Sequence, residues 1–227
     1  ARVYGAQSSA LTPHVVSVET DLSRGLHSFT LVGLPDKAVE ESRDRVAAAI
    51  KHAGFESPKS RNQKIVISLA PADIKKEGPL FDLPIALSYL LAADDVRFDA
   101  ESLLFIGELG LDGRLRGVPG VLPLVAFAKK QGKEAVFVPK ENAREAALVP
   151  GIEAFGAESL MQVVEHLNTK RSREGAGKHM PLAVTPRTTL KARVTETEFA
   201  FEDIRGQESA KRAAIIAAAG GHNLGLS

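Results

Sequence analysis

The chain has 227 residues, of which 44% are hydrophobic and 25% charged, and its formal net charge is +1. This length suffices for one sizeable domain with an appendage, and the composition is that of a globular protein with a core. The small net charge excludes attraction of the whole surface to nucleic acid. The absence of cysteine excludes disulfides and thiolate chemistry. Because no apolar run approaches a membrane span and the first residues do not resemble a signal peptide, we expect a cytoplasmic protein.

The first third of the chain predicts strands followed by a helix. Pro13 and Arg24-Gly25 separate three β-prone runs, which we expect to pair antiparallel: residues 3–11, 15–21 and 26–32. Asp36 opens a helix that ends at Gly54. Its inner face carries the apolar side chains, namely Val39, Val46, Ala49 and Ile50. The charged face of this helix, with Glu41, Ser42 and Arg45, is predicted to be solvated and to take part in no chemistry.

The most informative stretch is residues 75–92. A strand at 65–69 precedes it, Gly78-Pro79 predicts a turn, and Asp82 can cap a helix that has Pro84 in its first turn. Apolar residues then recur with helical spacing, at Leu83, Ala86, Leu87, Leu90 and Leu91. The N-terminus of a buried helix can bind anions or activate a nucleophile, so this stretch is either a site or a core helix with a well-defined start.

The second half of the chain alternates strands and helices. A strand is predicted at 103–107, a hairpin at 109–115 around Asp112-Gly113, and a helix after Pro119 and Pro123. Further on, a strand, a short helix, a strand and a helix are predicted at residues 135–138, 142–149, 152–155 and 160–167. Because strands separated by helices pair in parallel, we expect a parallel sheet here.

The remaining residues divide into a linker and a second module. Residues 169–198 are rich in Lys, Arg, Ser, Gly and Pro and are predicted to form a flexible linker after a first domain over residues 1–168. Residues 199–227 begin another module, with a helix at 207–219 that ends at Gly220-Gly221.

Four motifs carry a resemblance to a known family. They are Val32 to Pro35, Gly78 with Phe81 to Ala86, Glu108 to Gly113, and Phe201 to Gln207. These runs resemble the magnesium-chelatase-like AAA+ proteins of the ComM and YifB type. The resemblance implies an α/β fold like the Lon protease domain, a two-layer fold similar to a ribosomal-protein domain, followed by the linker and the start of an AAA+ module. Ser68 departs from the family pattern, in which Asn is usual.

The resemblance also implies a function for the longer protein. Such proteins are hexameric ATPases that drive DNA branch migration during natural transformation, with ATP and Mg²⁺ as cofactors. We therefore expect self-association into a ring and backbone contacts with DNA. The segment Ile204, Arg205, Gly206 and Gln207 would lie against the adenine. Because the sequence contains no phosphate-binding loop, we expect this chain to need no cofactor and to hydrolyse no ATP.

A proteolytic function can be tested at the positions of the Lon Ser–Lys dyad. The resemblance places the nucleophile directly after Gly78-Pro79, where this chain has Leu80. The lysine would fall at Leu122 or Leu124. A nucleophile needs a hydroxyl and a general base needs a titratable group, and leucine supplies neither. We therefore predict no catalytic residue in this chain.

The sequence indicates no metal site and gives only a weak indication of a DNA-binding site. None of the six histidines has ligand spacing to another, so no metal site is predicted. A basic ridge for phosphate contacts is predicted from Lys59, Arg61, Lys64, Lys75 and Lys76, with a solvated loop as the alternative. Two other functions remain open: a chelatase-like remodeller that acts on a protein partner, and an unconventional peptidase.

Overall fold

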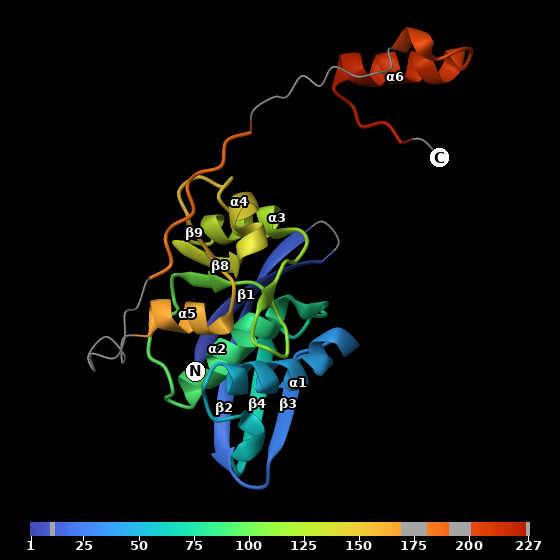
Figure 1. Ribbon diagram of the computed structural model, residues 1–227. Coiled ribbons are helices and arrows are strands. Elements are labelled where there is room, and N and C mark those ends of the chain that lie inside the picture. Colours follow the sequence, from blue (N-terminus) through green and yellow to red (C-terminus); the bar gives the residue numbers. More distant parts are fainter. Residues whose placement is uncertain (10–11, 169–180, 191–200, 226–227) are drawn as a thin grey trace. The chain divides into compact units, whose positions relative to one another are not determined.

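The computed structural model describes residues 1–9, 12–168, 181–190 and 201–225 (Figure 1). The chain forms two compact units, Ala1–Thr189 and Leu190–Ser227. The first unit is a mixed α/β domain, as the sequence predicts. No helix in the described ranges is long and apolar enough to cross a membrane.

The first unit contains a four-stranded sheet with the order β1-β2-β4-β3. Its strands are β1 (Arg2–Ser9), β2 (Thr12–Arg24), β3 (Ser28–Val32) and β4 (Gln63–Ala70). β1 and β4 both pair antiparallel with β2, whereas β3 pairs parallel with β4. The predicted antiparallel pairing of runs 15–21 and 26–32 is therefore wrong, because β4 lies between them. The intervening helix makes β3 and β4 a β-α-β unit, whose strands must be parallel.

Two helices cover one face of this sheet: α1 (Lys37–His52) and α2 (Asp82–Ala92) (Figure 1). The predicted inner face of α1 is confirmed, since its four apolar side chains are fully buried. α2 packs against α1, β1 and β2, and every residue from Asp82 to Leu90 is buried. The prediction of a buried helix is confirmed. The sequence indicates burial of one apolar face, whereas α2 is buried on all of its sides.

A second, three-stranded sheet is parallel, as predicted, and has the order β5-β8-β9. Its strands are β5 (Leu103–Phe105), β8 (Ala135–Pro139) and β9 (Glu153–Ala157). A small hairpin of β6 (Glu108–Leu109) and β7 (Leu115–Arg116) follows β5. The helices of this half are α3 (Val121–Lys130), α4 (Ala143–Ala146) and α5 (Leu160–Leu167).

The two faces of this parallel sheet belong to different hydrophobic clusters. Phe105, Phe137 and Phe155 stack across the three strands, with ring centroids 5.2 and 5.0 Å apart, and join the core formed with α1, α2 and α5. The opposite face packs against α3 and α4. Each strand therefore contributes to both clusters, which explains why β8 is buried throughout.

Part of the predicted flexible linker belongs to the first unit. Residues 169–180 and 191–198 lie outside the described residues, but residues 181–190 are described. Val184 forms an antiparallel bridge with Phe155 of β9, and the Thr185 N–H donates to the Ala154 carbonyl at 2.8 Å. The prediction of a flexible linker is therefore wrong for residues 181–189, which we call the strap.

The second unit is described from residue 201 to 225. A 3-10 turn, Phe201–Asp203, precedes α6 (Glu208–Gly220). The helix predicted at 207–219 is confirmed within one residue at each end. Gly221 adopts a left-handed conformation directly after α6, as expected for a helix that stops at glycine.

The turn after β3 depends on Gly33, which has a φ of +107°, and we predict that Gly33→Ala destabilises the first unit by about 3 kcal/mol. An added Cβ would lie 2.1 Å from the Leu69 carbonyl oxygen of β4, which cannot move without breaking the sheet. Thermal or urea unfolding measures the effect.

The matched control for this prediction is Gly132→Ala. Gly132 also has a positive φ, but no atom lies within 4 Å of its added Cβ. This variant should lose only the cost of the left-handed conformation, about 1 kcal/mol. Equal losses in the two variants would show that backbone strain, and not the contact with β4, makes glycine necessary at position 33.

Candidate functional site at the start of helix α2

The turn before α2 holds Leu80, where the resemblance to Lon places the nucleophile of a Ser–Lys dyad, whereas α3 holds Leu122 and Leu124, where it places the lysine. Gly78 has a φ of +80°, the 3-10 turn Pro79–Phe81 follows, and α2 begins at Asp82. Leu80 is partly buried against the cluster that contains Val121 and Leu124 of α3. A leucine directly after Gly78-Pro79 is expected to be a buried packing residue, and the structure shows it as only partly buried. Leu122 is 37% exposed.

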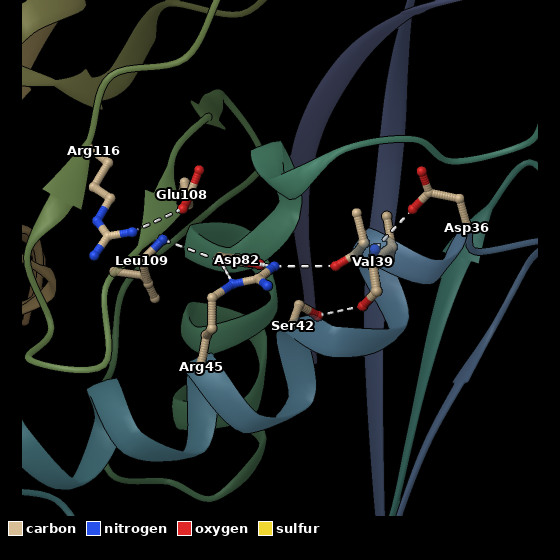
Figure 2. Close-up of polar contacts among 9 residues, drawn as sticks. Asp36, Val39, Ser42, Arg45, Asp82, Glu108, Leu109 and Arg116 are labelled. Carbon is tan, nitrogen blue, oxygen red and sulfur yellow. Dashed lines mark hydrogen bonds and ion pairs between the residues drawn. The ribbon is translucent and has the colours of Figure 1, made fainter.

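Asp82 does not cap α2, contrary to the prediction. The N-cap position is Phe81, which makes no side-chain hydrogen bond there. The fully buried Asp82 carboxylate instead accepts two hydrogen bonds from Arg45 of α1, from Nε at 2.7 Å and Nη2 at 3.0 Å, and a third from the Leu109 N–H at 3.1 Å (Figure 2). One side chain thus connects α2 to both α1 and β6.

Arg45 and Ser42 do not lie on a solvated face, so that prediction is wrong for both. Besides Asp82, Arg45 donates to the Ala38 carbonyl at 3.1 Å. Ser42 is fully buried and its hydroxyl donates to the Val39 carbonyl at 2.6 Å (Figure 2). Only Glu41 is exposed as expected. The inner side of α1 therefore includes a polar section that faces the start of α2.

A second carboxylate holds the turn from its other side. Asp36 caps α1 by accepting a hydrogen bond from the Val39 N–H at 2.8 Å, and its other oxygen accepts one from the Gly78 N–H at 3.2 Å. Asp36 and Asp82 thus fix residues 78–81 at both ends relative to α1. This arrangement positions the turn, and both carboxylates are used in doing so.

Burial raises the pKa of Asp82 to about 6, although the hydrogen bonds and charge of Arg45 act in the opposite direction. The same hydrogen bonds raise the pKa of Arg45. Glu108, which pairs with Arg116 at 3.3 Å, adds a smaller upward effect on Asp82 (Figure 2). Asp82 is fully buried and both of its oxygens accept hydrogen bonds from the protein, so a substrate cannot reach it and this pair acts structurally.

The predicted DNA-binding residues do not form one exposed basic ridge. Three of them have acidic partners: Lys59 pairs with Asp44 at 2.7 Å, Lys75 with Glu77 at 3.1 Å, and Arg61 with Glu56 and Asp95 at 3.0 and 2.9 Å. Lys64 is exposed on β4 and no contact to an acid is observed for it in the described structure. Local pairing thus removes most of the positive field that the sequence suggests.

The prediction that Lys76 contacts DNA is wrong, because this side chain is 0% exposed. Its ammonium donates to the Ile74 carbonyl at 2.7 Å and to the Pro71 carbonyl, and burial lowers its pKa. The Lys76 backbone also bonds both ways to the turn after β3, donating to Leu34 and accepting from Asp36. Lys76 therefore holds the loop before Gly78 in place and cannot contact a phosphate.

The residues proposed to contact adenine lie together in the second unit. Ile204 is exposed, and Gly206 and Gln207 have positive φ values of 66° and 56° at the start of α6. This turn leaves its residues accessible, and their contact with adenine stays a prediction. Likewise, no cluster of three or more potential metal-ligating side chains occurs in the parts of the chain that the structure describes.

Comparisons with known proteins agree on one family. A family model described as subunit ChlI of Mg-chelatase matches residues 18–142, and a second, described as magnesium chelatase, subunit ChlI, matches residues 200–227. Competence protein ComM of Haemophilus influenzae is 42% identical over 98% of this chain and 42% of its own length. YifB of Escherichia coli is 40% identical over 92% of this chain and 38% of its own length.

The similarity to Lon is weaker. Lon protease 2 of Bacillus subtilis is 26% identical over 73% of this chain and 31% of its own length. The chain therefore spans about two fifths of its ComM and YifB relatives and about a third of this protease.

For the buried pair, we predict that Arg45→Met destabilises the first unit by about 3 kcal/mol at pH 7.5, because the Asp82 carboxylate is left buried without its partner. The loss should shrink as the pH falls from 7.5 to 4.5, since a protonated Asp82 no longer needs a cation. Denaturation of both proteins at each pH measures this. A loss that is independent of pH would show that packing of Arg45, and not its charge, matters.

The stability of the wild type should also depend on pH through Asp82, and it should decrease as the pH rises. The folded pKa of Asp82, about 6, exceeds its ordinary value of 3.8, so protonation favours the folded state. This contribution is complete below pH 3.8 and is lost as the pH rises through about 6. Arg2→Met, which removes an exposed pair with Glu19, is the control for Arg45→Met and should leave the free energy of unfolding unchanged at pH 7.5 and at pH 4.5.

Proposed function

Since the chain belongs to the family of subunit ChlI of Mg-chelatase, we propose that it is the N-terminal part of a ComM-like AAA+ ATPase and that its first unit is a non-catalytic module with a Lon-like fold. The observation that carries this proposal is the turn before α2. It is held from two sides by buried or capping carboxylates, yet it presents Leu80 where a protease needs a hydroxyl. The scaffold of such a site is present without a nucleophile or a base.

In this proposal the longer protein forms a hexameric ring that uses ATP and Mg²⁺ to drive branch migration of DNA in natural transformation. When bound, ATP supplies the free energy for this movement. The first unit contributes to ring assembly, to DNA guidance or to both. The name of the Haemophilus relative, a competence protein, supports a connection with DNA uptake. The turn at Ile204 to Gln207 lies where it could contact the adenine.

A protein partner is the second candidate, and one observation favours it. Of the five basic residues proposed for DNA, one is buried and three are paired with acids. A surface neutralised in this way suits a partner other than a polyanion. In a chelatase-like remodeller the first unit would contact another protein and would show no affinity for DNA.

DNA binding by this chain separates the two candidates. If the first unit guides DNA, binding should be weak, independent of sequence, and shallow in its salt dependence, with a log–log slope of about −0.9 for each phosphate neutralised. Lys64→Ala should then reduce affinity severalfold for every sequence tested and flatten the slope by about one phosphate. Fluorescence anisotropy on duplexes at several salt concentrations measures both.

Lys130→Ala is the matched control, because Lys130 is exposed at the far end of α3, away from β4. Equal effects of the two variants would show nonspecific attraction, and no binding at low salt would favour the protein partner. Because Lys59 and Arg61 are paired with acids, replacing all of Lys59, Arg61 and Lys64 by Ala should add little to the loss from Lys64 alone.

A peptidase is tested at the turn itself. Leu80→Ser should give no cleavage of casein, because Leu122 and Leu124 still supply no base. Since Leu80 is only partly buried, the change should cost about 1 kcal/mol of stability. Leu122→Ser, at a position that is 37% exposed, should cost a similar amount in unfolding experiments and should likewise give no cleavage. Casein cleavage by the Leu80 variant would contradict the non-catalytic assignment.

A further inference from the structure

The strap, residues 181–189, extends the parallel sheet by one antiparallel segment. Val184 bridges to Phe155, and the Thr185 N–H donates to Ala154 at 2.8 Å. Farther along, the Thr188 N–H donates at 3.1 Å to the carbonyl of Ala147, the residue after α4. The strap therefore covers the edge of β9, whose backbone groups would otherwise be unpaired.

The start of the strap has its own receptor on α5. The Leu182 N–H donates to Nδ1 of His166 at 3.0 Å, and the Leu182 side chain packs against the main core. The His166 ring lies against Phe155 and Phe137, with centroid distances of 4.7 and 5.4 Å. Burial lowers the pKa of His166, which keeps the imidazole neutral and able to accept this hydrogen bond.

The strap is nevertheless held by few interactions. Most of its side chains are exposed, and Val184, its central apolar residue, is 46% exposed. Val184, Thr185 and Arg187 form one side of a cavity of about 540 Å³, and the loops after α3 and α4 form the other. A segment with a handful of backbone hydrogen bonds over a cavity can open without unfolding the domain.

Docking of the strap changes the length of chain that connects the two units. With the strap on β9, the connection to Phe201 is residues 190–200, which can span at most about 40 Å. Without it, the connection begins after α5 and comprises residues 169–200, which can span at most about 115 Å. These limits hold whatever conformation the connecting residues adopt.

We propose that the strap is a releasable latch. Docked on β9, it keeps the second unit on a short connection to the first; released, it lengthens this connection almost threefold and uncovers the β9 edge. The latch is set by the His166 receptor, the Thr185 and Thr188 hydrogen bonds and the Leu182 contact. It requires neither DNA nor a ring, so it stands independently of the proposed function.

Hydrogen exchange on the 227-residue chain tests the latch directly. The amides of Thr185 and Thr188 should exchange at least about tenfold more slowly than in an unstructured peptide, but faster than those of Val136 and Val138 in β8. Exchange at the peptide rate would show that the strap is not docked. Protection equal to that of β8 would show that it is a fixed part of the fold. Either result overturns the proposal.

Paired variants then separate release from unfolding. Thr185→Pro removes the N–H that bonds to Ala154, whereas Thr185→Ala keeps it. Only the proline variant should raise exchange at Thr188 and tryptic cleavage after Arg187 by about tenfold, with β8 exchange unchanged. His166→Phe keeps an aromatic ring against Phe155 but removes the acceptor, so it should raise exchange at Leu182. If Thr185→Ala opens the strap as much as Thr185→Pro, its backbone hydrogen bonds do not hold it.

Förster resonance energy transfer between two dyes measures whether release of the strap lengthens the connection between the two units. Because the chain lacks cysteine, Ser60→Cys and Ser209→Cys place one dye on each unit at exposed positions. Thr185→Pro should broaden the distance distribution toward larger values than in Thr185→Ala. An unchanged distribution, despite faster exchange of the strap, would show that release does not lengthen the connection and would overturn that part of the proposal.

Discussion

The buried ion pair between Arg45 and Asp82 is the constraint on which the first unit depends. Removing two charges from water is costly, and the cost is offset only when the geometry and the remaining hydrogen bonds are complete. Here Arg45 comes from α1, Asp82 from α2, and the Leu109 N–H from β6. None of these elements can shift by a turn without leaving a buried charge unpaired. The pair therefore couples the placements of α1, α2 and the hairpin to one another.

The same ion pair helps to hold the turn before α2, and the position of this turn does not depend on the side chain at its centre. The turn at 78–81 is positioned by Asp36, by Asp82 and by the buried Lys76 before it, and none of these depends on the side chain at Leu80. A leucine at this position therefore leaves the turn intact. The residues that hold the turn in place are therefore different from Leu80, the residue at the position of the nucleophile.

The sequence predicted the features that depend on local patterns. Helix α1 begins after Asp36 as expected, α2 is buried, and the alternation in the second half correctly indicated a parallel sheet. It failed where the partner is distant in the chain. Arg24-Gly25 resembles a hairpin turn, but the partner of β3 is β4, more than thirty residues later. Arg45 looked like a surface cation because its partner, Asp82, is 37 residues away. The strap was predicted to be a linker because it is held mainly by hydrogen bonds of its backbone N–H groups, and the amino-acid composition does not reveal such bonds.

The distribution of charge on the chain limits how strongly one copy could bind a polyanion. A net charge of +1 results from nearly equal numbers of both signs, and three of the five basic residues predicted to contact DNA pair with a nearby acid. Exposed pairs such as Lys59–Asp44 are weak, typically 0.2–1 kcal/mol, so a phosphate could compete for the lysine. Each such contact would then gain only the difference between two ion pairs, while the freed acid would repel the backbone nearby. Binding to a polyanion by one copy of this surface must therefore be weak. Only repetition in an assembly would make it strong, since linked sites raise the effective concentration without any new contact.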